Sequence, residues 1–252
     1  MISSAISNWT RLYADIAKEI ERLSEGGREP LLFRGQPDSS FLLTPSIARS
    51  GLRNIVAAET HLYINFVIRA GKLLPPEAVG WSILFIMQHH NLPTRLLDWS
   101  DTFSVALYFA LKNARKDAAV WVLKPHVLNS LTMRRGSIVN VQELGVTYED
   151  CYINHSVTLP ASVVALTPPR YYERVAQQRA AFTLHDDLVQ SLDNAHPTAV
   201  AKFIIPRKAQ AGARQFLAMA GISEYSLFPD LDGLARELRG ALTESGLTTH
   251  RS

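Results

Sequence analysis

The chain has 252 residues, which is long enough for one large domain or for one domain with an appended subdomain. Apolar residues make up 47% of it and charged residues 19%, as in a globular protein with a sizeable core. The formal net charge of +3 does not by itself indicate nucleic-acid binding, and the single cysteine, Cys151, excludes a disulfide framework or a cysteine-based zinc site.

The sequence carries no targeting or membrane signal that we recognise. The N-terminal residues lack the basic stretch and following apolar stretch of a signal peptide. No window of about 18 uninterrupted apolar residues predicts a membrane span. We therefore expect a soluble, cytoplasmic protein that does not bind a membrane.

The first half of the chain predicts helices that alternate with short strands. Apolar residues recur at helical spacing from Trp9 to Leu23, after a candidate cap at Ser7 and before two glycines. Buried strands are expected over residues 30–35 and 95–99, and helices over residues 54–70, 81–88 and 102–111.

The second half predicts strands over residues 118–123, 163–166 and 201–205, and helices over 207–220 and within 223–239. Residues 125–160 show no clear periodicity. Because short strands lie between helices of unequal length, we expect an α+β fold, with short mixed or antiparallel sheets flanked by helices. We divide the chain into an N-terminal helical segment (1–28), a single main domain (29–240) and a flexible tail (241–252).

A first polar cluster, Phe33-Arg34-Gly35-Gln36, ends an apolar strand. Gly35 permits close backbone approach, and an Arg held by a rigid strand suits a phosphate or ribose contact. The alternative is an Arg whose stem packs on the core while its head pairs with a carboxylate.

A second and denser cluster runs from His89 to Ser100 between two apolar stretches. A buried polar group without a partner costs roughly 1–3 kcal/mol, so these residues either satisfy one another or form a site. Asp98 could act as a base or accept a hydrogen bond from a ribose hydroxyl, and it could equally hold the loop by accepting hydrogen bonds from backbone N–H groups. Trp99 suits base stacking or the core, and Ser100 is also a natural N-cap for the next helix.

His89 and His90 invite a metal or an acid–base interpretation. Adjacent residues on a helix point roughly 100° apart, so two such side chains rarely face one ion. No matched carboxylate spacing follows them. We expect no metal site, and instead a histidine that positions a loop or contacts a ligand.

A third cluster comprises Arg174, Gln177, Gln178 and Phe182. Its glutamines could orient a ribose or an attacking group, or they could form an exposed polar stretch. The chain has no nucleophile-elbow, P-loop or dinucleotide-binding glycine motif, so the standard hydrolase, NTPase and dinucleotide folds lack support.

Together these clusters resemble the FRG domain family of bacterial proteins. The family's aromatic-Arg-Gly motif matches residues 33–35, and its H-[HY]-x-x-P-T-R-L-L-D-W-[ST] string matches residues 89–100. Its A-L-x-F-A segment matches residues 106–110, and a run L-F-P-D-L-D-G-L matches residues 227–234. A further motif matches Arg174, Gln178 and Phe182, where Ala180 replaces the usual glycine.

The family's layout resembles that of ADP-ribosyltransferases, and this likeness implies roles for individual residues. Arg34 would hold the NAD pyrophosphate, and Gln178 would take the late position that orients the ribose. Thr94, Asp98 and Ser100 would frame the ribose and nicotinamide. A glutamine cannot act as a general base, which leaves open weak transfer, NAD hydrolysis or binding without chemistry.

The resemblance predicts an NAD-dependent effector of a bacterial toxin or phage-defence system. NAD would be its substrate, and a nucleic-acid or protein acceptor and an antitoxin or chaperone are candidate partners. One alternative is a non-catalytic sensor that binds a nucleotide or nucleic acid, and another is a metal-dependent phosphohydrolase or nuclease that uses the histidine pair and Asp98. The expected catalytic residues are Arg34, Asp98 and Gln178, and the expected ligand-binding residues are Gly35, His89, His90, Thr94, Arg95, Ser100 and Arg174.

Overall fold

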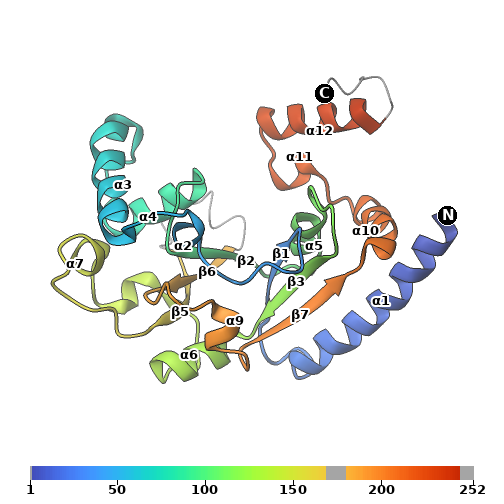
Figure 1. The fold of residues 1–252 in the computed structure, drawn as a ribbon, viewed down its shortest axis with the longest axis horizontal. Coiled ribbons are helices and arrows are strands. Elements are labelled where there is room, and N and C mark those ends of the chain that lie inside the picture. The colour runs from blue at the N-terminus through green and yellow to red at the C-terminus, as the bar shows by residue number, and fades with distance from the viewer. Residues whose placement is uncertain (1, 169–179, 245–252) are drawn as a thin grey trace.

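The computed structural model describes residues 2–168 and 180–244. Within these residues one seven-stranded open sheet runs through the molecule with helices around it (Figure 1). The strand order is β4-β5-β6-β2-β1-β3-β7, and only the β4–β5 pair is parallel. This arrangement confirms the predicted α+β class. The strands are β1 (Leu32–Gln36), β2 (Leu96–Ser100), β3 (Ala118–Leu123), β4 (Val139–Asn140), β5 (Val163–Thr167), β6 (Ala180–His185) and β7 (Val200–Ile205).

The helices that the sequence predicts are present, with two corrections at their starts, and the described residues form four further α-helices, over 46–49, 125–133, 148–152 and 192–195, that were not predicted. The first helix begins at Ile2, so Ser7 lies inside it and is not its cap. Ser100 is not the N-cap of the fifth helix either, because Thr102 takes that position while Ser100 Oγ accepts a hydrogen bond from its backbone N at 3.1 Å. The α-helices are α1 (Ile2–Leu23), α2 (Ser46–Arg49), α3 (Ile55–Ala70), α4 (Trp81–His89), α5 (Phe103–Leu111), α6 (Pro125–Met133), α7 (Tyr148–Tyr152), α9 (Leu192–Ala195), α10 (Arg207–Met219), α11 (Glu224–Leu227) and α12 (Leu231–Glu244), and the 3₁₀ turns are η1 (Gly71–Leu73) and η2 (Val141–Leu144).

The sheet separates the core into three apolar clusters. Neighbouring residues Leu32 and Phe33 of β1 belong to different clusters, as do Leu96 and Leu97 of β2, because successive strand residues face opposite sides of a sheet. One face packs against α1, α5 and α10 at the β1–β3–β7 end and against α4 and α7 at the β5–β6 end. The opposite face packs against α6 and α9.

The N-terminal helix shares the core of the sheet. Its residues Trp9, Ile16 and Leu23 are buried in the same cluster as β1, β3 and α5. Trp9 also contacts the ring of Phe216 on α10, at 5.6 Å between centroids. The proposed division at residue 28 stays a prediction, but α1 packs as part of the sheet domain.

Gly35 allows β1 to lie very close to α5. A Cβ atom at this position would stand 1.9 Å from the backbone O of Ala106 and 2.4 Å from the backbone N of Ala110. Only a residue without a side chain fits that crossing. The glycine thus fixes the strand that carries Arg34 against the helix that follows Ser100.

None of the helices in the described part of the chain has the length and apolar character needed to cross a membrane.

Candidate functional site

The adjacency of β1 and β2 brings together two of the predicted catalytic residues, Arg34 and Asp98. Phe33 pairs with Ser100 in the antiparallel register, so the part of β1 after Phe33 lies beside the part of β2 before Ser100. Arg34 Nη1 donates a hydrogen bond to the backbone O of Asp98 at 2.8 Å and lies 3.6 Å from its Oδ2 atom. We call these two residues the Arg34–Asp98 pair.

The guanidinium of Arg34 is largely enclosed and incompletely satisfied. Its side chain is 19% exposed, and its buried Nε atom has no hydrogen-bond partner among the described residues. Burial lowers the pKa of Arg34 from its ordinary value, while the charge of Asp98 opposes that change. An arginine remains protonated in proteins, so Nε presents an N–H donor that still needs an acceptor.

Asp98 is the exposed residue of the segment from Thr94 to Ser100. Between Thr94 and Ser100 it alone is exposed, with 54% of its side chain open to solvent. This segment therefore presents one carboxylate to solvent, while its other side chains are buried or half-buried.

A short relay of hydrogen bonds orients that carboxylate. Asp98 Oδ2 accepts from Gln88 Nε2 at 2.7 Å, and Gln88 Oε1 accepts from the hydroxyl of Thr94. Thr94 Oγ1 in turn accepts from the backbone N of Leu96 at 3.2 Å. Because the backbone N–H occupies the hydroxyl oxygen, the hydroxyl proton goes to Gln88, and the amide NH₂ is left facing Asp98. Sequence reasoning missed Gln88; its one signal was a polar residue at the end of the apolar run 81–87.

Thr94 ties this relay to α2 and is itself buried, at 1% exposure. Its backbone N donates to Ser46 Oγ at 3.0 Å, and its backbone O accepts from the backbone N of Ile47 at 3.2 Å. The side chain of Thr94 thus acts on the site through Gln88.

Arg95 uses its charge inside the protein. Its Nε atom lies 2.6 and 2.8 Å from the two carboxylate oxygens of Glu59 on α3, and both side chains are buried. Its guanidinium also stacks 4.1 Å from the ring centroid of Tyr152, and the hydroxyl of Tyr148 donates to Glu59 at 2.8 Å. This geometry gives Arg95 the role of joining α3 and α7 to β2.

The two histidines lie at the exposed end of α4. His89 and His90 are both exposed, and their rings contact edge to face at 5.3 Å between centroids. In the part of the chain that the structure describes, no group of three or more His, Cys, Asp or Glu side chains is arranged to hold a metal ion. Their predicted ligand contact stays a prediction.

The third sequence cluster lies mainly outside the described residues, and this includes Arg174, Gln177 and Gln178. Phe182 is described: it is buried on β6 and packs edge to face on Phe85 of α4, at 4.9 Å between ring centroids. It pairs with Asp98 in the β2–β6 register.

Trp99 is enclosed in the core and anchored there, so its ring does not face a ligand. It is 2% exposed, and its indole N–H donates to Thr183 Oγ1 at 3.1 Å. Thr183 Oγ1 lies 2.9 Å from Nε2 of the fully buried His185. Burial, with a smaller contribution from the charge of Arg34, lowers the pKa of His185 to about 3, so this histidine is neutral at physiological pH.

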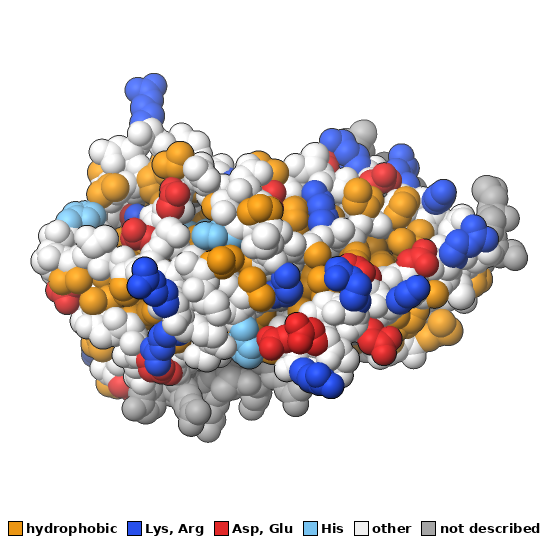
Figure 2. Space-filling view, turned by 90° about the horizontal axis from the view of Figure 1, so that it is seen from below, with side chains coloured by type: hydrophobic (Ala, Val, Ile, Leu, Met, Phe, Trp, Pro, Cys, Tyr) orange, Lys and Arg blue, Asp and Glu red, His pale blue; other side chains and the backbone are white. Residues whose placement is uncertain are grey.

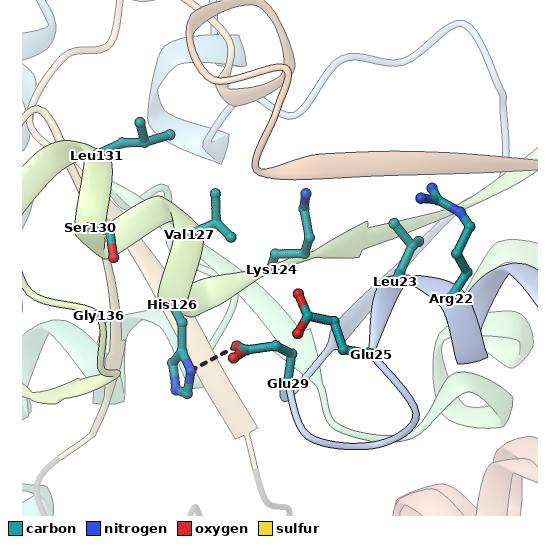
Figure 3. Close-up of a pocket in the computed structure, with 10 residues that line it drawn as sticks. All are labelled: Arg22, Leu23, Glu25, Glu29, Lys124, His126, Val127, Ser130, Leu131 and Gly136. Carbon is teal, nitrogen blue, oxygen red and sulfur yellow. Dashed lines mark hydrogen bonds and ion pairs between the residues drawn. The ribbon is translucent and has the colours of Figure 1, made fainter.

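The Arg34–Asp98 pair can be compared with two other features of the surface, namely the distribution of charged side chains and a cavity. On the face seen in Figure 2, basic and acidic side chains are interspersed and form no continuous basic surface. A cavity of about 520 Å³ lies between the end of α1 and α6, where His126 Nδ1 and Glu29 Oε2 are 3.0 Å apart (Figure 3). None of the predicted site residues lines that cavity. The Arg34–Asp98 pair is therefore separate from it.

Comparison with known proteins gives one match. Residues 29–119 match the FRG domain. The matched span contains β1, α4, β2 and α5, and hence both residues of the Arg34–Asp98 pair. The comparisons with curated proteins and with solved structures gave no match. The FRG resemblance is thus supported over these residues, whereas the likeness to ADP-ribosyltransferases stays a prediction.

Proposed function

We propose that the FRG domain binds a nucleotide at the Arg34–Asp98 pair and that this nucleotide is NAD. The observation that carries the proposal is the contact of a guanidinium, which keeps one unused N–H donor, with an exposed carboxylate. Guanidinium groups bind phosphate oxygens, and a carboxylate accepts hydrogen bonds from ribose hydroxyls. A cation and an acceptor side by side fit a ligand that carries both a phosphate and a ribose hydroxyl.

The chemistry we propose is cleavage of the bond between nicotinamide and ribose. Positive charge develops on the ribose as nicotinamide leaves with the electron pair of that bond, and the negative charge of Asp98 would stabilise it. Attack by water then gives ADP-ribose and releases a proton, whereas attack by an acceptor hydroxyl or amine gives ADP-ribosylation. Consumption of NAD is the activity through which such a protein would serve as a toxin or phage-defence effector.

The second candidate function is nucleotide binding without chemistry. It is favoured by the amide at position 178, which cannot accept a proton as a general base. In that case Arg34 and Asp98 recognise the ligand and a partner reads the bound state.

The test is incubation of the protein with NAD and measurement of free nicotinamide. We expect release by the wild type, and a fall of about 100-fold on Asp98→Asn, as when one preorganised electrostatic group is removed. Arg34→Ala should weaken NAD binding. Asp15→Asn makes the same chemical change at an exposed position of α1 and should leave the rate unaltered.

The remaining outcomes separate the candidates. NAD binding that needs Arg34 and Asp98, without nicotinamide release, supports the binding module. Activity that a chelator abolishes supports the metal-dependent alternative. If the protein neither binds NAD nor releases nicotinamide from it, the proposal is overturned.

A further inference from the structure

The cavity between the end of α1 and α6 lies apart from the Arg34–Asp98 pair and has a volume of about 520 Å³ (Figure 3). Sites that hold small molecules measure roughly 300–1,000 Å³, so this cavity is large enough for a ligand. Its walls come from the C-terminal end of α1, from the turn that follows it, and from α6 with the capping residue Lys124. We call it the α1–α6 cavity.

Two carboxylates from the turn after α1 line the α1–α6 cavity. The backbone N of Glu25 donates to the backbone O of Arg22 at 3.2 Å, and the backbone N of Glu29 donates to that of Ser24 at 2.9 Å, so the turn is held in place. Glu29 Oε2 lies 3.0 Å from His126 Nδ1, and because a carboxylate only accepts, that nitrogen carries a proton. Among the described residues no donor reaches Glu29 Oε1 or either carboxylate oxygen of Glu25. These oxygens are therefore available to a ligand.

Lys124 supplies the opposite charge. The residue is half-buried, and its backbone N donates to the backbone O of Ala199 at 2.8 Å. Within the part of the chain that the structure describes, its ammonium group has no carboxylate partner. Arg22 also lines the cavity, but its Nε and Nη2 atoms donate to Glu19 at 2.8 and 2.6 Å. Lys124 and Glu25 thus border one cavity with opposite charges and form no ion pair with each other.

Three apolar side chains also line the cavity. Leu23 is buried, Val127 is half-buried, and Leu131 is 55% exposed. Removing apolar surface from water is favourable, so a ligand with an apolar group gains free energy of binding by covering Leu131.

The available carboxylate oxygens suit an ammonium group rather than a metal ion. No three or more His, Cys, Asp or Glu side chains of the described residues are arranged to hold a metal, and this applies to Glu25, Glu29 and His126. An ammonium group donates three separate hydrogen bonds and needs no such close cluster of acceptors.

We propose that the α1–α6 cavity binds a free α-amino acid with a large apolar side chain. The carboxylate of the ligand pairs with Lys124, its ammonium donates to Glu25 and Glu29, and its side chain covers Leu131. An α-amino acid carries these three groups on one carbon atom, so a single small molecule satisfies both unpaired charges and the apolar wall. The inference goes beyond the proposed nucleotide function, because it assigns a second ligand to a separate cavity.

Calorimetry of the full chain with L-phenylalanine tests the site. Lys124→Gln and Glu25→Gln should each weaken the binding of phenylalanine by about 10- to 100-fold, the loss typical of one charge-assisted contact. Lys72→Gln and Glu77→Gln make the same chemical changes at exposed positions that do not line the cavity, and they should leave the affinity unaltered. Melting temperatures of the four variants establish that they are folded.

Two analogues test the charges of the ligand itself. Phenethylamine lacks the carboxylate and hydrocinnamate lacks the ammonium, so each should bind the wild type more weakly than phenylalanine does. Lys124→Gln should bind phenethylamine as the wild type does, because this ligand lacks the group that pairs with Lys124. Glu25→Gln should likewise bind hydrocinnamate as the wild type does.

The outcomes decide the assignment independently of NAD turnover. Phenylalanine binding that both cavity variants weaken and both control variants leave unchanged supports the amino-acid site. If the wild type does not bind phenylalanine, the assignment is overturned. It is also overturned if neither Lys124→Gln nor Glu25→Gln weakens binding, or if both analogues bind the wild type as tightly as phenylalanine.

Discussion

Arg95 and Glu59 form a buried ion pair in which the guanidinium Nε lies 2.6 Å and 2.8 Å from the two carboxylate oxygens. Arg34, on the neighbouring strand, instead meets an exposed carboxylate and keeps an unused donor. Two arginines from adjacent motifs thus have different surroundings. This contrast separates the residue that we expect to bind a ligand from the one that holds the fold.

The first prediction concerns that buried pair. Removing one partner of a buried ion pair leaves an uncompensated charge and costs about 3–5 kcal/mol, so Glu59→Gln should lower the free energy of unfolding by about that amount. Replacing both partners, in Glu59→Leu with Arg95→Met, should recover much of the loss because neither charge then remains buried. Urea unfolding measures both values.

An exposed ion pair provides the control. Glu19→Gln breaks the surface contact with Arg22 on α1 and should give little measurable change in stability. A loss as small for Glu59→Gln as for Glu19→Gln would contradict the structural role of Arg95.

The second prediction concerns Gly35. A methyl group there would lie 1.9 Å from the backbone O of Ala106, so β1 and α5 must move apart to admit it. We expect Gly35→Ala to lower the free energy of unfolding by at least about 3 kcal/mol, at the upper end of overpacking effects. Gly240→Ala, in α12 where a Cβ meets nothing within 4 Å, should instead raise stability by about 0.5–1 kcal/mol. Equal effects of the two changes on the melting temperature would refute this account.

The third prediction concerns Gln88 as a positioning residue. Gln88→Leu removes the amide that holds Asp98 Oδ2 at 2.7 Å and leaves the Thr94 hydroxyl without its acceptor. We expect the affinity for NAD to fall by about 5- to 20-fold, together with a loss of roughly 1 kcal/mol in stability. Gln190→Leu, at an exposed position, should alter neither quantity.

A second variant separates positioning from stability. Thr94→Val keeps the volume of the side chain but removes the hydroxyl that orients the Gln88 amide. It should reproduce the loss of NAD affinity. Stability loss without any loss of affinity, in both variants, would show that the relay is structural only.

Much of the fold could be predicted from local patterns. The helix over residues 55–70 and the strand over 118–123 follow from apolar spacing and from glycine at the helix end, because these signals are local. The segment 125–160 gave no prediction since its order depends on distant contacts. In α6, for example, Asn129 is fully buried and its side chain bonds the backbone N and O of Ala165, 36 residues away.

The candidate site could be predicted only in part for the same reason. The sequence drew attention to Arg34 and Asp98, but their contact requires the β1–β2 pairing across 64 residues. The dense polar motif also suggested more ligand contacts than its geometry offers, because Thr94, Arg95 and Trp99 direct their polar atoms at Gln88, Glu59 and Thr183. Sequence periodicity cannot distinguish a polar residue that binds a ligand from one that bonds to a neighbouring helix or strand.

The last prediction concerns the dependence of stability on pH through His185. This histidine is fully buried, and burial lowers its pKa in the folded protein from 6.5 to about 3. Between these values the unfolded chain binds a proton that the folded chain does not. The contribution of His185 to the free energy of unfolding is therefore completely present above about pH 6.5. It decreases as the pH drops toward 3, by up to about 1.4 kcal/mol per pH unit.

Urea unfolding at several pH values between 7 and 4 measures this slope. In His185→Gln the dependence of the free energy of unfolding on pH should be shallower by up to about 1.4 kcal/mol per pH unit, which corresponds to one proton. Stability at pH 7 should also fall because the contact with Thr183 is altered. His61→Gln removes an exposed histidine of α3 and should leave the slope as in the wild type. An unchanged slope in His185→Gln would mean that His185 takes up its proton in the folded protein as readily as in the unfolded chain, against the burial that the structure gives it.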